Sequence, residues 1–245
     1  MRTFIFSMVA VVLAFSSPAM ASGTFGSIDL GYLGRPGPHM GNGGRFDYDV
    51  VNDSSLSLPA GFDVNRYDSP SSVVPGGQDG VDDLFTFCIE TTQSVPGNAS
   101  SNSYMVDPVG AGSALDLLGD YYFSQAVQPG NNTEAGAFQL AAWELVLGDG
   151  DLGTPPATAS GSYTAAAVAL ATTWLNNVTG GSLTDIVETQ MVTLKNGSFQ
   201  DQVTQITAVP EASALIVWSF VGGAIGLVVY RRHVLGLTAE SPSLG

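Results

Sequence analysis

The sequence contains very little cysteine, histidine or basic side chain. Its 245 residues include one cysteine, Cys88, and two histidines. A single cysteine cannot form an internal disulfide, which excludes the disulfide framework of many small exported domains. Seven Lys and Arg residues stand against 22 Asp and Glu, and the net charge is −15. Because so acidic a chain repels phosphate backbones, we exclude nucleic acid as a partner.

The sequence also lacks the motifs of common cofactor and metal sites. It has no phosphate-binding loop, no dinucleotide fingerprint and no zinc-ligand spacing. The acidic turns at 79–83 and 149–151 do not match the spacing of a calcium-binding loop with its terminal Glu. We therefore expect no cofactor and no metal ion.

The chain begins with the pattern of an export signal. Arg2 precedes an apolar run over residues 4–15 and a small-x-small site at 19–21. This order is typical of a secretory signal, and the run is short for a membrane span. We predict a signal peptide over residues 1–21 with cleavage after Ala21; an uncleaved anchor is the alternative.

A second apolar segment lies near the C-terminus. Residues 212–230 carry no charge and are long enough for a transmembrane helix at about 1.5 Å per residue. Arg231 and Arg232 follow directly, and such a basic pair predicts a cytoplasmic C-terminus. We predict a transmembrane helix over 212–230, a cytoplasmic tail over 234–245 and the main domain outside.

The start of this segment adds a sorting signal. Val209, Pro210 and Glu211 precede the apolar span, and the whole of 209–233 resembles the PEP-CTERM sorting tail of Gram-negative bacteria. The resemblance implies an exosortase-like processing enzyme as partner, anchoring in the inner membrane before processing, and then a place at the cell surface or in the extracellular matrix. The match departs at Ala212, where a second proline is usual. A plain C-terminal anchor is the alternative.

Residues 22–208 form the predicted extracellular domain. They suffice for one domain with a core, or for two small ones. The region from Ser22 to Val209 holds 20 acidic and four basic residues, a net charge of −16. Period-two alternation and turn residues predict strands at 24–33, 84–90, 186–194 and 198–207 and one or two strands over 46–58. Residues 91–109 are predicted as a polar loop with a short strand at 103–106. The Asn196-Gly197 dipeptide predicts a tight hairpin between the last two strands.

The middle of the domain has helical periodicity. Apolar spacing predicts helices at 113–123, from about 131 to 147, and at 163–178. The second of these should carry one apolar stripe formed by Phe138, Ala141, Ala142, Leu145 and Val146. Strands, then helices, then strands predict an α+β domain in which a β-sandwich or barrel-like sheet carries an inserted helical subdomain.

Two segments in this domain carry candidate chemistry. In the strand at 84–90, Leu84, Thr86, Cys88 and Glu90 share one face, and Phe85, Phe87 and Ile89 share the other. The Phe-Cys-Ile-Glu order at 87–90, followed by Phe-Gln-Leu-Ala-Ala-Trp-Glu-Leu at 138–145, resembles the thioester domains of bacterial surface adhesins. Residues 117–123 look like the helix between the two motifs in that family. The resemblance implies an internal thioester between the Cys88 and Gln139 side chains.

The chemistry needs these two residue types. A thiolate is both a good nucleophile and a good leaving group. Attack of the Cys88 sulfur on the Gln139 carboxamide expels ammonia, and an amine or hydroxyl can then displace the sulfur from the acyl group. Proximity accelerates both steps, and backbone donors near the Gln139 carbonyl are needed to stabilise the oxyanion. Phe87 and Trp143 are the candidates for shielding the bond from water.

Three functional readings follow from these patterns. The first is an exported bacterial surface protein, not an enzyme, that acts as a covalent adhesin or matrix linker on a polysaccharide or protein target. The second is a non-reactive structural or binding protein of the extracellular polysaccharide matrix, because a single strand cysteine is usually an inert packed residue. The third is a small Cys-His hydrolase, which would need His39, the only histidine of the domain.

Overall fold

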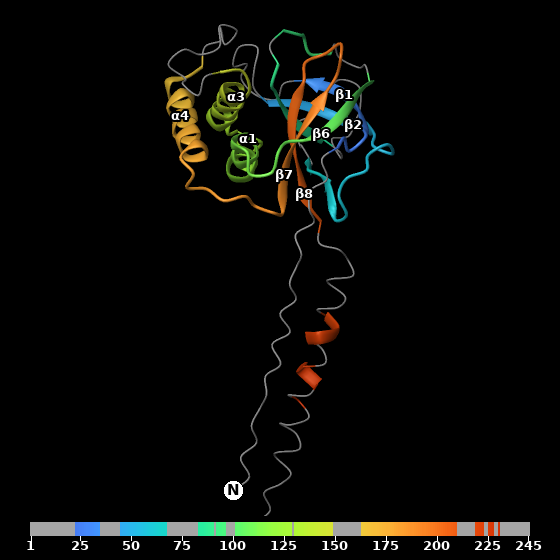
Figure 1. Ribbon diagram of the computed structural model, residues 1–245. Helices are drawn as coiled ribbons and strands as arrows, with labels where there is room; N and C mark the ends of the chain where they lie inside the picture. The colour runs from blue at the N-terminus through green and yellow to red at the C-terminus, as the bar shows by residue number, and fades with distance from the viewer. Residues whose placement is uncertain are drawn as a thin grey trace, which may run out of the picture.

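The structure is a computed structural model that describes residues 23–34, 45–67, 83–90, 92–96, 101–128, 130–148 and 163–209, with short pieces between 219 and 230. These residues form an α+β fold in which a β-barrel carries a helical layer on one side (Figure 1). The predicted α+β class is therefore confirmed. The predicted signal peptide, His39 and most of the predicted sorting tail lie outside the described residues.

Six antiparallel strands close the barrel. They follow the order β8-β7-β6-β1-β2-β5, and β5 pairs back with β8, at Phe87 opposite Val203 and Cys88 opposite Gln202. Of the two predicted arrangements, sandwich or barrel, the barrel is present. The strands are β1 (Ser27–Gly34), β2 (Arg45–Asn52), β5 (Asp83–Cys88), β6 (Ser101–Pro108), β7 (Thr189–Lys195) and β8 (Gln202–Ala208). Two short strands extend the sheet: β3 (Phe62–Val64) on β8 and β4 (Arg66–Tyr67) on β5.

The inside of the barrel is filled by aliphatic and aromatic side chains, most of them from alternate strand positions, with Phe25 and Trp143 from outside the strands. We call this set the barrel-interior cluster; its buried members are Phe25, Ile28, Leu30, Tyr32, Phe46, Tyr48, Val64, Leu84, Cys88, Tyr104, Val106, Trp143, Val192, Leu194 and Ile206. Tyr32, Tyr48 and Tyr104 form a chain of ring contacts, with centroids 5.4 and 6.1 Å apart and edge-to-face geometry. Such contacts add to the stabilisation from burial alone.

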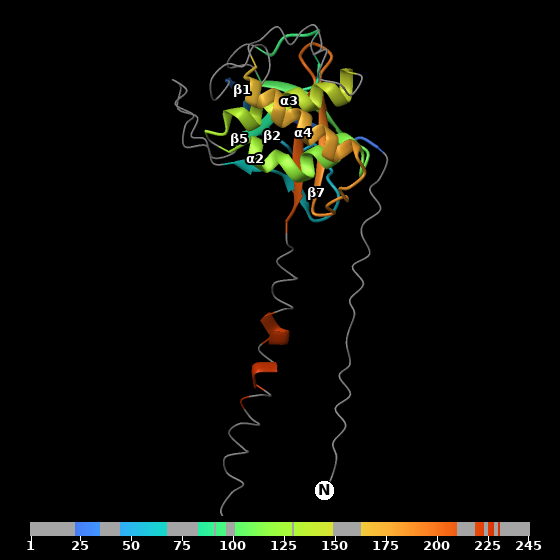
Figure 2. The ribbon, with the colours of Figure 1, turned by 90° about the vertical axis from the view of Figure 1, so that its left-hand side faces the viewer.

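The helices lie between β6 and β7 in the chain, so the predicted helical insertion is confirmed. They are α1 (Ala114–Leu118), the π-helical turn η1 (Gly119–Phe123), α2 (Ser124–Ala126), α3 (Asn132–Leu147) and α4 (Ala165–Thr179). Figure 2 shows α3 and α4 across one side of the barrel. At Gly119 the helical layer touches the sheet directly, because a Cβ atom there would lie 2.2 Å from the Met191 side chain.

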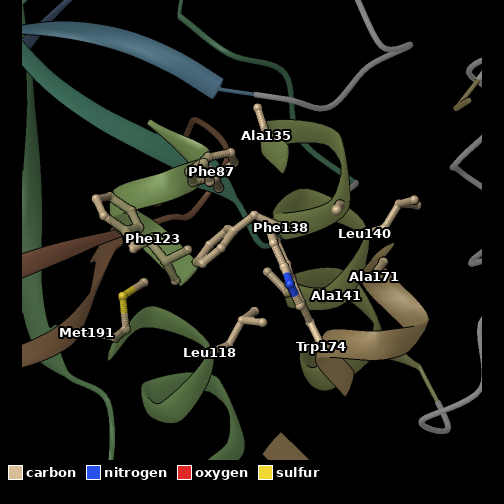
Figure 3. Close-up of a cluster of buried hydrophobic side chains, with 14 of the residues drawn as sticks. Phe87, Leu118, Phe123, Ala135, Phe138, Leu140, Ala141, Ala171, Trp174 and Met191 are labelled. Atoms are coloured by element: carbon tan, nitrogen blue, oxygen red, sulfur yellow. The ribbon is translucent and has the colours of Figure 1, made fainter. Parts of the chain in front are cut away.

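A second core fills the space between barrel and helices. We call it the helix-facing cluster; its buried members are Phe85, Phe87, Ile89, Leu117, Leu118, Phe123, Ala126, Val127, Ala135, Ala137, Phe138, Leu140, Ala141, Ala142, Ala171, Trp174, Leu175, Val178, Met191 and Val203. Figure 3 shows Phe87, Phe123 and Phe138 converging at its centre. The Phe87 ring lies 4.6 Å from Phe138 and 5.9 Å from Phe123, centroid to centroid.

The predicted single apolar stripe on α3 is wrong. All residues from Ala135 to Glu144 are buried, on every side of the helix, whereas Val146 of the predicted stripe is exposed. α3 contacts both the barrel and α4, so no face of its middle turns reaches water. A helix in that position needs no polar face, and its sequence periodicity is correspondingly weak.

Two strand predictions also need correction. Strand β6 runs over eight residues in the segment predicted as mostly loop, because its outward face is polar while Tyr104 and Val106 point into the barrel. The β7–β8 hairpin is confirmed, but its connection runs from Asn196 to Asp201 and is longer than the tight turn predicted at Lys195-Asn196-Gly197. Gly197 lacks the positive φ that such a turn requires.

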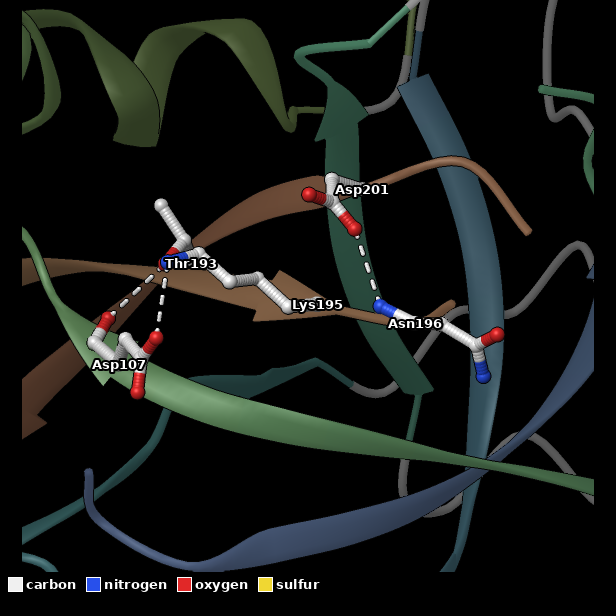
Figure 4. A network of polar contacts seen from close by, with 5 residues as sticks. All are labelled: Asp107, Thr193, Lys195, Asn196 and Asp201. Atoms are coloured by element: carbon white, nitrogen blue, oxygen red, sulfur yellow. Dashed lines mark hydrogen bonds and ion pairs between the residues drawn. The ribbon is translucent and has the colours of Figure 1, made fainter. Parts of the chain in front are cut away.

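Side-chain hydrogen bonds shape the longer connection. Asn196 Oδ1 accepts from the backbone N–H groups of Ser198 and Phe199. Asp201 Oδ1 accepts from the Asn196 N–H (Figure 4). On the outer face of the barrel, the Lys195 ammonium pairs with Asp107 at 2.9 Å.

No helix within the described residues is long and apolar enough to cross a membrane. Of the predicted transmembrane helix at 212–230, only 219–222, 225–227 and 230 are described. That helix therefore stays a prediction.

Candidate functional site

Cys88 is the last residue of β5 and faces the barrel interior. Leu84 and Cys88 belong to the barrel-interior cluster, whereas Phe85, Phe87 and Ile89 belong to the helix-facing cluster. The two faces predicted for this strand are thus confirmed, and both are buried. Cys88 forms no disulfide.

The Gln139 side chain, 51 residues further along the chain, reaches the Cys88 backbone. The Cys88 N–H donates to Gln139 Oε1 at 3.1 Å, and Gln139 Nε2 donates to the Cys88 carbonyl oxygen at 2.5 Å. The two residues paired by the sequence analysis are therefore in direct contact. The contact joins a strand end to the buried middle of α3.

The pairing of the strands explains why Cys88 accepts this partner. The Ile89 N–H donates to the backbone carbonyl oxygen of Asp201, the residue before β8, so the backbone groups of Cys88 point to the opposite edge of β5. On that edge the described pairing with β2 reaches Arg45 opposite Phe87. The Gln139 carboxamide has one donor and one acceptor in the same plane, like a peptide group, and it continues the ladder at Cys88.

The site is closed to solvent. Cys88 and Gln139 are both 0% exposed, and Trp143, one helical turn beyond Gln139, is 1% exposed. Gln139 is thus not the solvated helix residue that a glutamine in a helix usually is. Trp143 belongs to the barrel-interior cluster with Cys88, whereas Phe87 packs in the helix-facing cluster. Of the two residues predicted to shield the bond, Trp143 is the one on the Cys88 side.

Two tyrosines near the thiol were missed by the sequence analysis. Tyr48 of β2 and Tyr163, just before α4, both have a pKa raised above its ordinary value, first by burial and also by the negative charge that a Cys88 thiolate would place near them. Tyr163 meets Trp143 edge to face, with ring centroids 6.4 Å apart. Neither tyrosine stands at a motif position, so no local signal marks them.

Polar contacts fix the strand end that carries Cys88. The Thr86 hydroxyl donates to Gln202 Oε1 at 3.1 Å inside the barrel. Glu90 Oε2 accepts from the Asp201 N–H at 3.4 Å and Glu90 Oε1 accepts from the Thr92 hydroxyl. Glu90 therefore holds the chain after β5 against the β7–β8 connection.

A cluster of three acidic side chains lies on the helical layer, apart from Cys88 and Gln139. The sequence analysis expected no metal ion there. Carboxylate oxygens of Asp116, Asp120 and Asp185 lie within 4.8 Å of one another, close enough to hold a cation. Asp116 also accepts from the backbone N–H groups of Met191 and Gly112, both at 2.9 Å. Burial raises the pKa of Asp116 to about 6, the two hydrogen bonds oppose the shift, and the neighbouring carboxylates add to it. The four-residue spacing of Asp116 and Asp120 in a predicted helix was an available signal.

Several predicted positions lie outside the described residues. They are His39, the turn at 149–151, Pro210, Glu211, Arg231 and Arg232. Of the predicted sorting motif, Val209 is described; its N–H donates to the Gly61 carbonyl at 2.6 Å. The alternative of a Cys88–His39 hydrolase therefore stays a prediction that the described residues do not test.

Comparison of the chain with known protein families, curated proteins and solved structures found no match. Interpretation of the site therefore depends on its own geometry and chemistry.

Proposed function

We propose that this chain is an exported bacterial surface protein that attaches covalently to an external amine or hydroxyl through a Cys88–Gln139 thioester. Its role would be that of an adhesin or matrix linker, with one covalent event per molecule and no turnover. The observation that carries the proposal is the pair of hydrogen bonds that hold the Gln139 carboxamide on the Cys88 backbone in a fully buried site.

The geometry suits thioester formation. As the Cys88 sulfur adds to Gln139 Cδ, negative charge develops on Oε1, and the Cys88 N–H already donates to that atom. The C–Nε2 bond then breaks, and the nitrogen leaves as ammonia with the thiol proton. In the tetrahedral adduct the Nε2 lone pair is no longer conjugated with the carbonyl and can take that proton, while an Nε2 N–H donates to the Cys88 carbonyl oxygen. Burial excludes water from the acyl–sulfur bond.

The attachment step follows the same path in reverse. An amine or hydroxyl adds to Gln139 Cδ, the C–S bond breaks, and the electron pair returns to the Cys88 sulfur. The proton of the nucleophile ends on that sulfur, so the products are a Gln139 amide or ester and a Cys88 thiol. The Cys88 N–H again stabilises the oxyanion.

The position of the domain relative to the chain ends fits display outside the cell. β8 ends at Ala208, so the predicted sorting tail begins directly after the barrel closes. We propose that an exosortase-like enzyme processes this tail after inner-membrane anchoring by the helix at 212–230, and that the target is a polysaccharide or protein of the surface or matrix. Retention of the full-length chain in the membrane would argue against this processing.

A second candidate has its own observation. Gln139 completes the hydrogen bonding of Cys88 while its amide is intact, which is what a purely structural glutamine at a strand end would do. On this reading the chain is a non-reactive structural or binding protein of the extracellular polysaccharide matrix.

Intact mass distinguishes the two candidates. The exported chain should weigh about 17 Da less than its processed sequence, through loss of ammonia, and should gain about 31 Da with methylamine. Cys88→Ala and Gln139→Ala should each abolish the reaction with methylamine. A full calculated mass together with ready alkylation of Cys88 would sink the thioester proposal and favour the structural one.

Gln205→Ala is the matched control for loss of a buried amide. Gln205 is 3% exposed and donates to the Gly119 carbonyl at 3.1 Å, on the helical side of β8. Its replacement removes a comparable hydrogen bond without touching Cys88, so the mass loss and the reaction with methylamine should both persist.

A further inference from the structure

An amine or hydroxyl has no open path from solvent to the buried Cys88–Gln139 contact. Cys88 and Gln139 are fully buried, and Trp143 is almost so. On the helix-facing side the rings of Phe87, Phe123 and Phe138 are packed together, and opening that side would break a core. Some other part of the wall must move when a nucleophile enters.

Tyr163 occupies a distinctive place in that wall. Among the described residues it is the one partly buried side chain that packs against both the barrel-interior and the helix-facing clusters. Its ring meets Trp143 edge to face, and the residue is partly exposed to solvent. It precedes Thr164, the N-cap of α4, so no helical hydrogen bond fixes its backbone.

The Tyr163 hydroxyl limits the stability of this closed position. The oxygen is buried and has no hydrogen-bond partner within the described part of the chain. A buried hydroxyl without a partner costs free energy that water would restore if the side chain rotated outward. Ring burial therefore favours closing, while the unsatisfied hydroxyl favours opening. Trp143, which is 1% exposed and belongs to the barrel-interior cluster with Cys88, likewise has an indole N–H without a hydrogen-bond partner among the described residues. An entering polar group could accept from this N–H.

We infer that Tyr163 is the gate of the Cys88–Gln139 site: its ring shuts the site over Trp143, and its outward rotation admits the attacking amine or hydroxyl. The inference deepens the proposed function and rests on it for the identity of the reaction. The gate itself concerns access to Cys88, which is measurable whether or not the thioester forms.

Two substitutions of Tyr163 should change the rate of methylamine addition in opposite directions if Tyr163 is a gate. Tyr163→Ala removes the ring and should raise the rate of methylamine addition by about tenfold or more, and Tyr163→Phe keeps the ring but loses the hydroxyl penalty and should lower it by a similar factor. A purely structural role would change both rates in the same direction. The rates are measured by intact mass on the full exported chain, with thermal melting to confirm folding; Tyr163→Leu replaces the Ala variant if the latter does not fold.

A second readout separates the gate from the thioester. After treatment with methylamine, Cys88 is a thiol whether or not a thioester was present, and its native-state alkylation by iodoacetamide reports access alone. The alkylation rate should fall in the order Tyr163→Ala, wild type, Tyr163→Phe. If wild type shows no mass loss but this order holds, the thioester fails and the gate stands. If the Ala or Leu variant is alkylated no faster than wild type, the gate is wrong, whatever the mass shows.

Tyr122→Ala is the matched control. Tyr122 stacks on Trp174 with ring centroids 4.5 Å apart, also partly buried, but against the helix-facing cluster alone. Its loss removes a comparable tyrosine–tryptophan contact and should leave Cys88 alkylation at the wild-type rate. Faster alkylation in this variant would mean that general loosening, and not a gate at Tyr163, exposes the thiol.

Discussion

The two buried clusters on either side of β5 are built from different kinds of side chain. The helix-facing cluster consists mainly of phenylalanine, alanine and aliphatic side chains, with Trp174 and Met191 among them, and its ring contacts at Phe87, Phe123 and Phe138 hold the helices on the barrel. The barrel-interior cluster contains three tyrosines, a tryptophan and the single cysteine, so many of its members carry a polar atom.

This difference in composition suggests that the two faces of β5 have separate roles. Phe87 and Cys88 are neighbours in sequence, yet one side chain stabilises the fold and the other carries the candidate chemistry. Gln139 links the two faces, because it belongs to α3 of the helical layer and its side chain accepts a hydrogen bond from the Cys88 N–H at the end of the strand. Changes in one cluster should therefore alter stability, and changes in the other should alter reactivity.

The largest expected effect is on stability, from Phe123→Ala in the helix-facing cluster. Phe123 is fully buried, so the cavity should lower the free energy of unfolding by about 3–5 kcal/mol, measured by urea denaturation. Reaction with methylamine per folded molecule should stay unchanged. Tyr121→Ala is the control: its hydroxyl donates to Thr184 at the surface, and the change should cost about 1 kcal/mol or less. Loss of reactivity in folded Phe123→Ala protein would break the division between the clusters.

A smaller effect should come from protonation of Asp116 on the helical layer. Its pKa is raised from 3.8 to about 6, mainly by burial, so the folded state binds a proton that the unfolded state has released. This contribution to stability is complete below about pH 4 and is lost as the pH rises through about 6. Melting temperature should therefore fall across this window, and Asp116→Asn should flatten the fall.

High salt is the control for the Asp116 prediction. It screens long-range repulsion among the many carboxylates but not the desolvation of one buried group. A pH dependence that disappears in 1 M salt, or that persists unchanged in Asp116→Asn, would contradict the assignment to Asp116.

The smallest effect should follow Lys195→Ala, which touches neither cluster. The Lys195–Asp107 pair lies on the outer face of the barrel, and the lysine side chain is 53% exposed. Its loss should change the free energy of unfolding by less than about 1 kcal/mol, and less still at high salt. A larger change in urea denaturation would show that the outer face of the barrel contributes more to stability than the two-cluster comparison allows.

The candidate residues of the site, through the resemblance, and a good part of the fold, through periodicity, could be predicted from the sequence. Alternation in β5 correctly separated Cys88 from Phe87 and Phe85, because strand side chains alternate whatever their partner. The positions of α3 and α4 followed from apolar spacing and from the glycines that end them. The burial of α3 on all sides did not follow, because helical periodicity reveals a solvated face and this helix has none in its middle turns.

What the sequence by itself determined is the position of most strands and helices, since these depend on residue identity and local spacing. The choice of Cys88 and Gln139 as candidates came from the resemblance of their two motifs to thioester domains. Only the tertiary structure decided that β5 pairs with β8 to close a barrel, that Gln139 binds the Cys88 backbone, and that Tyr163 packs on Trp143 beside them. Pairing between strands more than a hundred residues apart, and contacts between a helix and a strand end, leave no periodic signal in the chain. They arise from the packing of whole elements, which fixes the neighbours of each side chain.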